Sequence, residues 1–76
     1  MGGRLSVEFV LPNAAPARLE LLDVAGRRVA LRDVGPLGPG RHEVDLSVDR
    51  ALAPGLYLVR LSQGAMRLVR RVSVLE

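Results

Sequence analysis

The side chains that could do chemistry are few in this chain and lie far apart. Its 76 residues include one histidine, four serines and no cysteine. Because side chains alternate between the two faces of a strand, His42 would point away from its nearest carboxylates, Glu43 and Asp45. No serine lies in a Gly-x-Ser-x-Gly turn, so a nucleophile would lack both a base and an exposed position. The sequence therefore predicts a solvated histidine at a strand end and a protein that is not an enzyme.

Metal and cofactor sites have little support in the sequence. Asp45 and Asp49 flank a loop and could hold a calcium ion, but their spacing matches no loop of known ligand geometry. Gly35, Gly38 and Gly40 alternate with prolines, which lack the backbone amides that would bind a phosphate. We expect a solvated loop at Asp45 and Asp49, and no cofactor.

Arginine supplies all of the positive side-chain charge apart from histidine, with eleven arginines, no lysine and a net charge of +3. Arg60, Arg67, Arg70 and Arg71 could form a basic patch for nucleic acid. However, the chain has one Phe and one Tyr, and we expect both in the core, which leaves no platform for base stacking. Charged strand faces that keep sheet edges from associating explain the arginines better. We expect no nucleic-acid partner, and an arginine-rich nucleic-acid-binding module is the weakest alternative.

The composition is that of one small globular domain. Hydrophobic residues make up 49% of the chain and charged residues 25%, and the length allows one core. The chain has no continuous apolar segment that could span a membrane, so we expect no membrane insertion. The Met-Gly-Gly opening is typical of a fragment start. We therefore assign residues 1–4 to this start and residues 5–76 to the domain, and expect the natural chain to begin upstream.

Apolar and polar residues alternate along most of the chain, which is the pattern of strands with one buried face. Gly and Pro separate these stretches at a spacing of about ten residues, and no helical period is present. The predicted fold class is all-β, a small antiparallel sandwich of six to seven strands. The predicted strands cover residues 5–11, 17–23, 28–33, 42–48, 56–61 and 66–76.

Two turns carry specific expectations. Residues 17–33 are predicted to form a hairpin in which the Asp23 side chain bonds the turn amides. Gly26 in this turn, and Gly40 in the segment rich in Gly and Pro, are expected to have positive φ. The following strand is predicted to point Val44, Leu46 and Val48 inward and Glu43, Asp45 and Ser47 outward, and the strand before that segment carries Val29 and Leu31 as its apolar positions.

The last two strands differ in regularity. Tyr57, Val59 and Leu61 alternate cleanly, which predicts a central strand with these side chains in the core. In the final strand, Arg70 shares a face with apolar residues such as Val72. Either Arg70 lies at the rim with its stem along the apolar surface, or a bulge near residues 69–71 shifts the register.

Three groups of residues resemble a known family in their order and spacing. They are Asp23-x-x-Gly26-Arg27, then Leu52-x-x-Gly55-x-Tyr57-x-x-x-Leu61, and then Gly64 followed by Arg70 and Arg71 before Val72. Together they are similar to the C-terminal sorting domain of type IX secretion cargo, a family that grades into the Ig-like domain of flagellar hook-capping proteins. The hook-capping branch usually has Trp-Asp-Gly where this chain has Asp45-Leu46-Ser47, so the sorting branch is the closer match.

This resemblance implies an Ig-like β-sandwich with no catalytic role. Such a module is the C-terminal part of a larger exported bacterial protein, is read by the outer-membrane secretion machinery and is in many members removed by a sortase-like protease. It would act as a monomer and reach the cell surface or the medium through the periplasm. Arg70, Arg71 and Val72 are the residues expected to be recognised, whereas Asp23, Gly26, Gly40, Gly55, Tyr57, Leu61 and Gly64 are expected to be structural. A structural Ig-like appendage of an extracellular protein is the main alternative.

Overall fold

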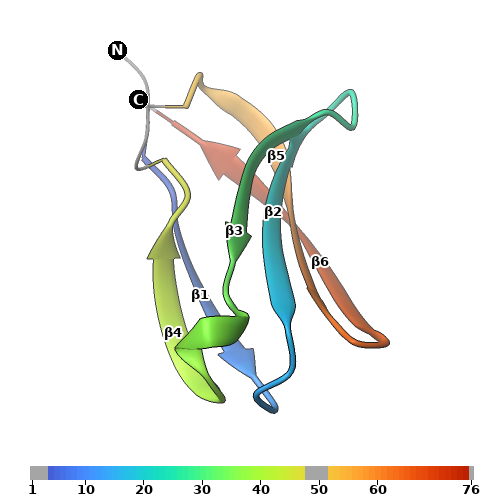
Figure 1. The fold of residues 1–76 in the computed structure, drawn as a ribbon. Coiled ribbons are helices and arrows are strands. Elements are labelled where there is room, and N and C mark those ends of the chain that lie inside the picture. The colour runs from blue at the N-terminus through green and yellow to red at the C-terminus, as the bar shows by residue number, and fades with distance from the viewer. Residues whose placement is uncertain (1–3, 48–51, 76) are drawn as a thin grey trace.

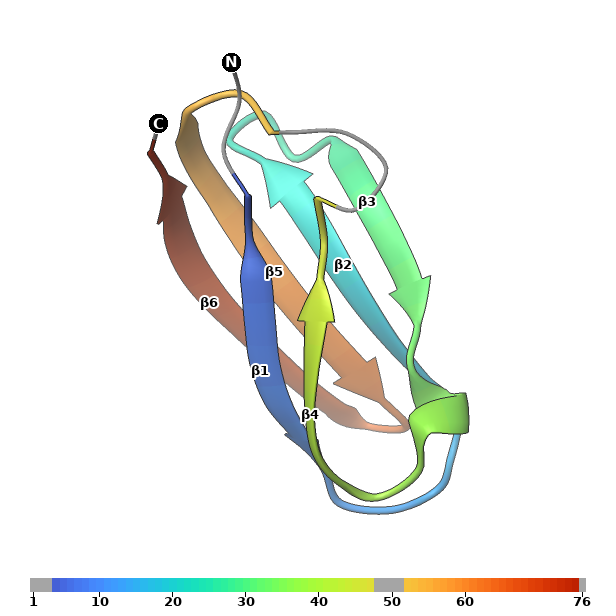
Figure 2. The ribbon, with the colours of Figure 1, turned by 90° about the vertical axis from the view of Figure 1, so that its left-hand side faces the viewer.

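Six strands and one turn of 3-10 helix make up the part of the chain that the structure describes, residues 4–47 and 52–75 of a computed structural model (Figure 1). The elements are β1 (Ser6–Leu11), β2 (Ala17–Asp23), β3 (Arg28–Asp33), η1 (Gly35–Leu37), β4 (Gly40–Asp45), β5 (Gly55–Gln63) and β6 (Met66–Val74). Strands β1 and β4 pair as a two-stranded sheet, and the others form a sheet in the order β3-β2-β5-β6. All pairs are antiparallel, and the two sheets lie face to face (Figure 2). The predicted all-β sandwich is confirmed.

The core lies between the two sheets and consists of the alternate side chains that the sequence assigns to one face. Burial of these side chains removes apolar surface from water, which is the main force that holds the sheets together. The predicted pattern of strands with one buried face is confirmed for β1, β2 and β5. The buried apolar side chains of the strands are Phe9, Leu11, Ala17, Leu19, Leu21, Tyr57, Val59, Leu61 and Val74.

The turn between β2 and β3 is closed by Asp23, as predicted. Its Oδ1 accepts hydrogen bonds from the backbone N–H groups of Ala25 at 3.0 Å and Arg27 at 2.9 Å. Its Oδ2 accepts a third bond from Nε of Arg27 at 3.0 Å. Gly26 has φ +86° and Gly40 has φ +114°, a region that favours glycine. Both predictions of positive φ are confirmed.

Tyr57 lies near the start of β5 and is buried, with 8% of its surface exposed. Its hydroxyl donates to the backbone carbonyl of Ala53 at 2.7 Å, so the one polar atom of the ring has a partner. A tyrosine near the start of such a strand that bonds the backbone a few residues upstream is typical of immunoglobulin-type sandwiches. The predicted burial of Tyr57 is confirmed, and its hydroxyl has the hydrogen-bond partner expected of a buried phenol.

One side of the sandwich is closed by the chain itself. Residues 34–39 cross from β3 in one sheet to β4 in the other, and they include η1 (Figure 1). Val34 is buried, and its N–H donates to the carbonyl of Ala17 at 2.9 Å. A Cβ atom added at Gly35 would lie 2.9 Å from backbone atoms of both Pro16 and Ala17. We call residues 34–39 with Pro16 and Ala17 the closed flank.

The structure corrects the predicted pattern of β3. The register between β2 and β3 shifts by one residue next to Leu22, which leaves Val29 as an extra residue on β3. Val29 and Ala30 pack against the core. Leu31 instead lies on the outer face, with 40% of its surface exposed. The expected simple alternation of Val29 and Leu31 is therefore wrong.

The end of β4 also differs from the prediction, because the strand stops at Asp45 and the chain then turns inward. Ser47 is buried, so its predicted outward position is wrong. Its Oγ accepts a bond from the N–H of Leu5 at 3.1 Å and donates to Oδ1 of Asp45 at 2.6 Å. These bonds hold the start of β1 against the end of β4. Leu46 is buried as predicted, and Val48 lies outside the described residues.

His42 is half-buried and not a solvated strand-end residue, so that prediction is wrong too. It lies opposite Phe9 in the register of β1 and β4, with the ring centroids 5.8 Å apart. Its Nε2 lies 2.7 Å from the carbonyl oxygen of Gly38, at the C-terminal end of η1. The histidine therefore joins the two-stranded sheet to the 3-10 turn, in a segment where no regular element was expected.

Candidate functional site

Strand β6 forms the most notable surface of the described chain, because its residues 67–71 are all exposed. Leu61 and Leu68 lie opposite each other in the β5–β6 register, yet Leu61 is 4% exposed and Leu68 is 43% exposed. The difference arises because the second sheet contains only β1 and β4, so much of the inner face of β6 lies beyond its cover (Figure 2). Apolar side chains on the inner face of β6 are thus available for contact.

The three residues expected to be recognised lie side by side on β6 but on different faces. The β5–β6 pairing is continuous from Val74 to Met66, so no bulge occurs and Arg70 shares the inner face with Val72. Arg70 lies at the exposed rim of this face, and its Nη1 donates to the carbonyl of Val69 at 3.0 Å. Arg71 is exposed on the outer face. The rim alternative for Arg70 is therefore confirmed.

An apolar groove runs between β1 and β6, on the side of the sandwich opposite the closed flank. Its volume is about 510 Å³. One wall is β1 with its flanking Leu5, and the floor is the inner face of β5 and β6. We call it the open groove, and Leu5, Ser6, Val7, Glu8, Phe9, Val10, Leu19, Val59, Leu61, Leu68, Arg70 and Val72 line it.

The wall of the open groove is the unpaired edge of β1. The N–H of Leu46 donates to the carbonyl of Leu5 at 2.8 Å, which sets the alternation of bonds between β1 and β4. In an antiparallel pair the bonded residues alternate with residues whose backbone groups face away. The N–H and C=O groups of Ser6, Glu8 and Val10 therefore point to the open groove. Among the described strands, only β4 pairs with β1.

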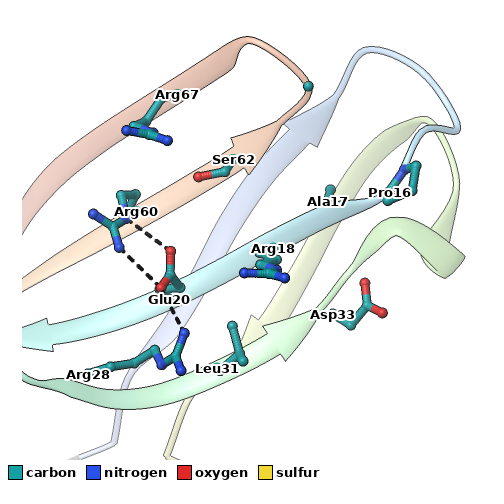
Figure 3. Close-up of a pocket in the computed structure, with 11 residues that line it drawn as sticks. Pro16, Ala17, Arg18, Glu20, Arg28, Leu31, Asp33, Arg60, Ser62 and Arg67 are labelled. Atoms are coloured by element: carbon teal, nitrogen blue, oxygen red, sulfur yellow. Dashed lines mark hydrogen bonds and ion pairs between the residues drawn. The ribbon is translucent and has the colours of Figure 1, made fainter.

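A second hollow lies on the outer face of the four-stranded sheet and is centred on Glu20 (Figure 3). Glu20 is 6% exposed although it points outward from β2. Arg60 on β5 donates to its two oxygens at 2.9 and 3.1 Å, and Arg28 on β3 donates at 3.3 Å. Three strands of the sheet are joined by this cluster. The alternation pattern places Glu20 in solvent, so sequence reasoning missed its burial.

The electrostatics of this cluster follow from its hydrogen bonds. The guanidinium of Arg60 holds the pKa of Glu20 below its ordinary value of 4.5, against the opposing effect of burial. In return, the carboxylate of Glu20 raises the pKa of Arg60. Arg18 and Arg67 line the same hollow and make no ion pair with any described residue. The rim of the hollow therefore carries Arg18 and Arg67 together with Asp33, while its central carboxylate is already neutralised.

The other motif residues support the fold. The pKa of Asp23 is lowered mainly by the backbone N–H of Arg27 in the β2–β3 turn. Leu61 lies in the core, Gly55 begins β5, and Gly64 lies in the β5–β6 turn with φ +58°. These residues therefore form no site of their own.

The residues considered for metal chemistry are not gathered in the described structure. Within residues 4–47 and 52–75, no group of three His, Asp or Glu side chains is placed to hold a metal ion. Asp45 bonds Ser47, which lowers its pKa, and its other oxygen lies 3.3 Å from Arg4. Asp49 lies outside the described residues. In the described part of the chain, no helix has the length and hydropathy to cross a membrane.

Three comparisons with known proteins were made for the whole chain. No protein-family model matches it, and neither a curated protein nor a solved structure was found to be similar to it.

Proposed function

We propose that this domain is a non-catalytic sorting module, carried at the C-terminal end of a larger exported bacterial protein and read by the outer-membrane machinery of type IX secretion. The observation that carries the proposal is the exposure of β6. Its arginines, Arg70 and Arg71, face solvent and make no ion pair with described residues. A module that directs export must present a surface that other proteins can recognise while the module is folded.

The motif residues that resemble the family divide into two groups on this structure. Asp23 and Tyr57 satisfy backbone groups of turns and loops, so their role is to hold the fold. Arg70 and Arg71 contribute little to the core and lie where another protein can reach them. Since a shared fold alone does not specify a function, we assign recognition by the secretion machinery to the second group.

The test is export of a reporter protein fused in front of the domain, in a bacterium with a working type IX apparatus. The unmodified fusion should reach the cell surface. With Arg70→Glu and Arg71→Glu, the reporter should stay in the periplasm, while circular dichroism shows that the domain remains folded. The control is Arg18→Glu with Arg41→Glu, which makes the same charge change at exposed positions on β2 and β4 and should leave export intact. Because Arg41 pairs with Glu8 at 3.5 Å, circular dichroism must show that this variant is also folded.

Two results would overturn parts of this proposal. If the unmodified domain fails to export its reporter, the module is a structural appendage of an extracellular protein. If the β6 variant is displayed as well as the unmodified domain, Arg70 and Arg71 are not part of the recognised surface.

A further inference from the structure

We infer that the open groove accepts one extended strand of a partner protein, which pairs with the free edge of β1 and lays its inward side chains on β6. This inference deepens the proposed function and rests on it only for the identity of the partner. A sandwich of this type commonly has seven strands, and here the smaller sheet has two. The open groove lies where a third strand of that sheet would run.

The first support is the backbone of β1. Ser6, Glu8 and Val10 direct unpaired N–H and C=O groups along the wall of the groove, as derived from the bond between Leu46 and Leu5. An extended peptide can satisfy such a row by adding a strand, and its backbone bonds then supply affinity whatever its side chains are. β1 has six residues, so a peptide of about seven residues covers the edge.

The second support is the chemistry of the groove floor. Leu68, Arg70 and Val72 follow one another at alternate positions on the inner face of β6. An added strand also presents every second side chain to this face. The complementary segment therefore has an apolar residue, then an acidic residue above Arg70, then an apolar residue, each separated by one outward-facing position. Arg70 is the only charged side chain of the floor, so it sets which residue the strand must carry at its centre.

Charge and burial favour a partner protein over a second copy of this chain. The exposed apolar strand that a second copy could offer is β6, but Arg67, Arg70 and Arg71 would then add positive charge beside Arg70. The inward side chains of β1, such as Phe9, are already buried in their own core. The net charge of +3 also opposes self-association. An acidic strand from another protein meets none of these obstacles.

In the test, a synthetic seven-residue peptide with the sequence Thr-Val-Thr-Glu-Thr-Val-Thr is added to the isotopically labelled domain. Two-dimensional NMR of the domain measures the binding. Saturable shifts are expected at the amides of Glu8 and Val10, and at Leu68 and Val72. Arg70→Glu should weaken binding at least tenfold. The peptide with Arg at its centre should show the opposite preference, binding Arg70→Glu more tightly than the unmodified domain. Such a charge exchange cannot result from a general loss of structure.

A tethered form of the test covers the case of low affinity for a free peptide. The same seven residues are joined to the front of Arg4 through an Asn-Gly turn, so that Val, Glu and Val lie opposite the inward-facing Leu5, Val7 and Phe9. The tether gives an effective concentration in the millimolar range. The melting temperature should rise with Glu at the centre of the added strand. With Arg there instead, it should rise only in the Arg70→Glu background.

The outcomes separate this inference from the proposed function. No change at Glu8 and Val10 with either the free or the tethered peptide overturns the groove as a docking site, even if reporter export succeeds. Peptide binding with the predicted charge exchange supports it, even if export fails. If light scattering shows a dimer and Arg70→Glu alters its dissociation, the occupant is a second copy and the inference is wrong.

Discussion

The two flanks of this sandwich show how differently the same alternating pattern can be used. On the closed flank, the chain crosses between the sheets, Val34 is 2% exposed and a Cβ atom added at Gly35 would lie 2.9 Å from the backbone of Pro16. On the opposite flank, which holds the open groove and which we call the open flank, no described segment crosses between β1 and β6, and Leu68 is 43% exposed. Both flanks carry apolar residues at inward positions. What decides their burial is whether another segment covers them, and the open flank is therefore the surface available to a partner.

The two edge strands of the larger sheet share a protective feature. Arg32 on β3 and Arg70 on β6 lie at inner-face positions, opposite Leu19 and Val59. Each donates through Nη1 to the carbonyl of the preceding residue, at 3.0 Å in both cases. Inward-pointing charges on edge strands oppose uncontrolled edge-to-edge association. On β6 this arginine also lines the open groove, so one residue both discourages aggregation and selects the charge of a partner.

The largest loss of stability is expected from changes at Tyr57, whose side chain lies in the core that both flanks share. Tyr57→Ala should lower the free energy of unfolding by about 4 kcal/mol, because it removes a buried aromatic ring. Tyr57→Phe should cost about 1 kcal/mol, since it leaves the carbonyl of Ala53 without its partner. Urea denaturation measures both. Equal midpoints for Tyr57→Ala and the unmodified domain would show that the ring lies in solvent.

Leu61 is covered by the second sheet and Leu68 is not. The stability of variants at these two positions therefore tests this difference between the flanks. Leu61→Ala should destabilise the domain by about 3 kcal/mol through a cavity in the core. Leu68→Ala, directly across the β5–β6 register, should cost less than about 1 kcal/mol because its side chain is already exposed. Similar losses for the two variants in urea denaturation would mean that the open groove is covered in solution.

On the closed flank, Gly35→Ala should destabilise the domain by about 2 kcal/mol, because its Cβ would overlap backbone atoms that cannot move aside easily. Leu37→Ala, on the same 3-10 turn, should change stability by less than about 0.5 kcal/mol because Leu37 is half exposed. Thermal unfolding of the two variants provides the measurement. A stable Gly35→Ala domain would show that the closed flank has room for an additional methyl group.

A smaller effect is expected from the Glu20 cluster on the outer face, which belongs to neither flank. The folded-state pKa of Glu20 is lowered, so its stabilising contribution is present above its ordinary pKa of 4.5 and is lost as the pH falls through the lowered value. The unmodified domain should therefore lose more stability than Glu20→Gln between about pH 5 and about pH 3. Asp23 and Asp45 also have lowered pKa values and titrate in the same way in both proteins. Parallel pH profiles in urea denaturation would contradict a structural role for the Glu20 cluster.

Local chemistry made part of this fold predictable from the sequence. Tyr57, Val59 and Leu61 alternate without interruption, so period two alone assigned them to the core. Asp23 and Gly26 are separated by three positions, and all the hydrogen bonds of their turn are local. In such cases the residues that decide the structure are close together in the sequence.

Features that depend on distant segments were not predictable. Glu20 is buried because Arg60 reaches it from a strand 40 positions away, and no local pattern reveals that contact. The exposure of Leu68 depends on how many strands the opposite sheet contains. Ser47 points inward because the N–H of Leu5, 42 positions away in the sequence, donates to its hydroxyl. The residues proposed for recognition do lie on an exposed strand, but the groove beside them was not foreseen.

The most direct test of the account is amide hydrogen exchange along β1 in the domain alone. The open flank predicts that the amides of Glu8 and Val10 exchange almost as fast as in an unstructured peptide, while those of Val7 and Phe9, which are bonded to β4, exchange slowly. Because the two sets alternate on one strand, global unfolding would affect them equally and cannot mimic the result. If Glu8 and Val10 are as protected as Phe9, the edge of β1 is already covered and the open flank does not exist in solution.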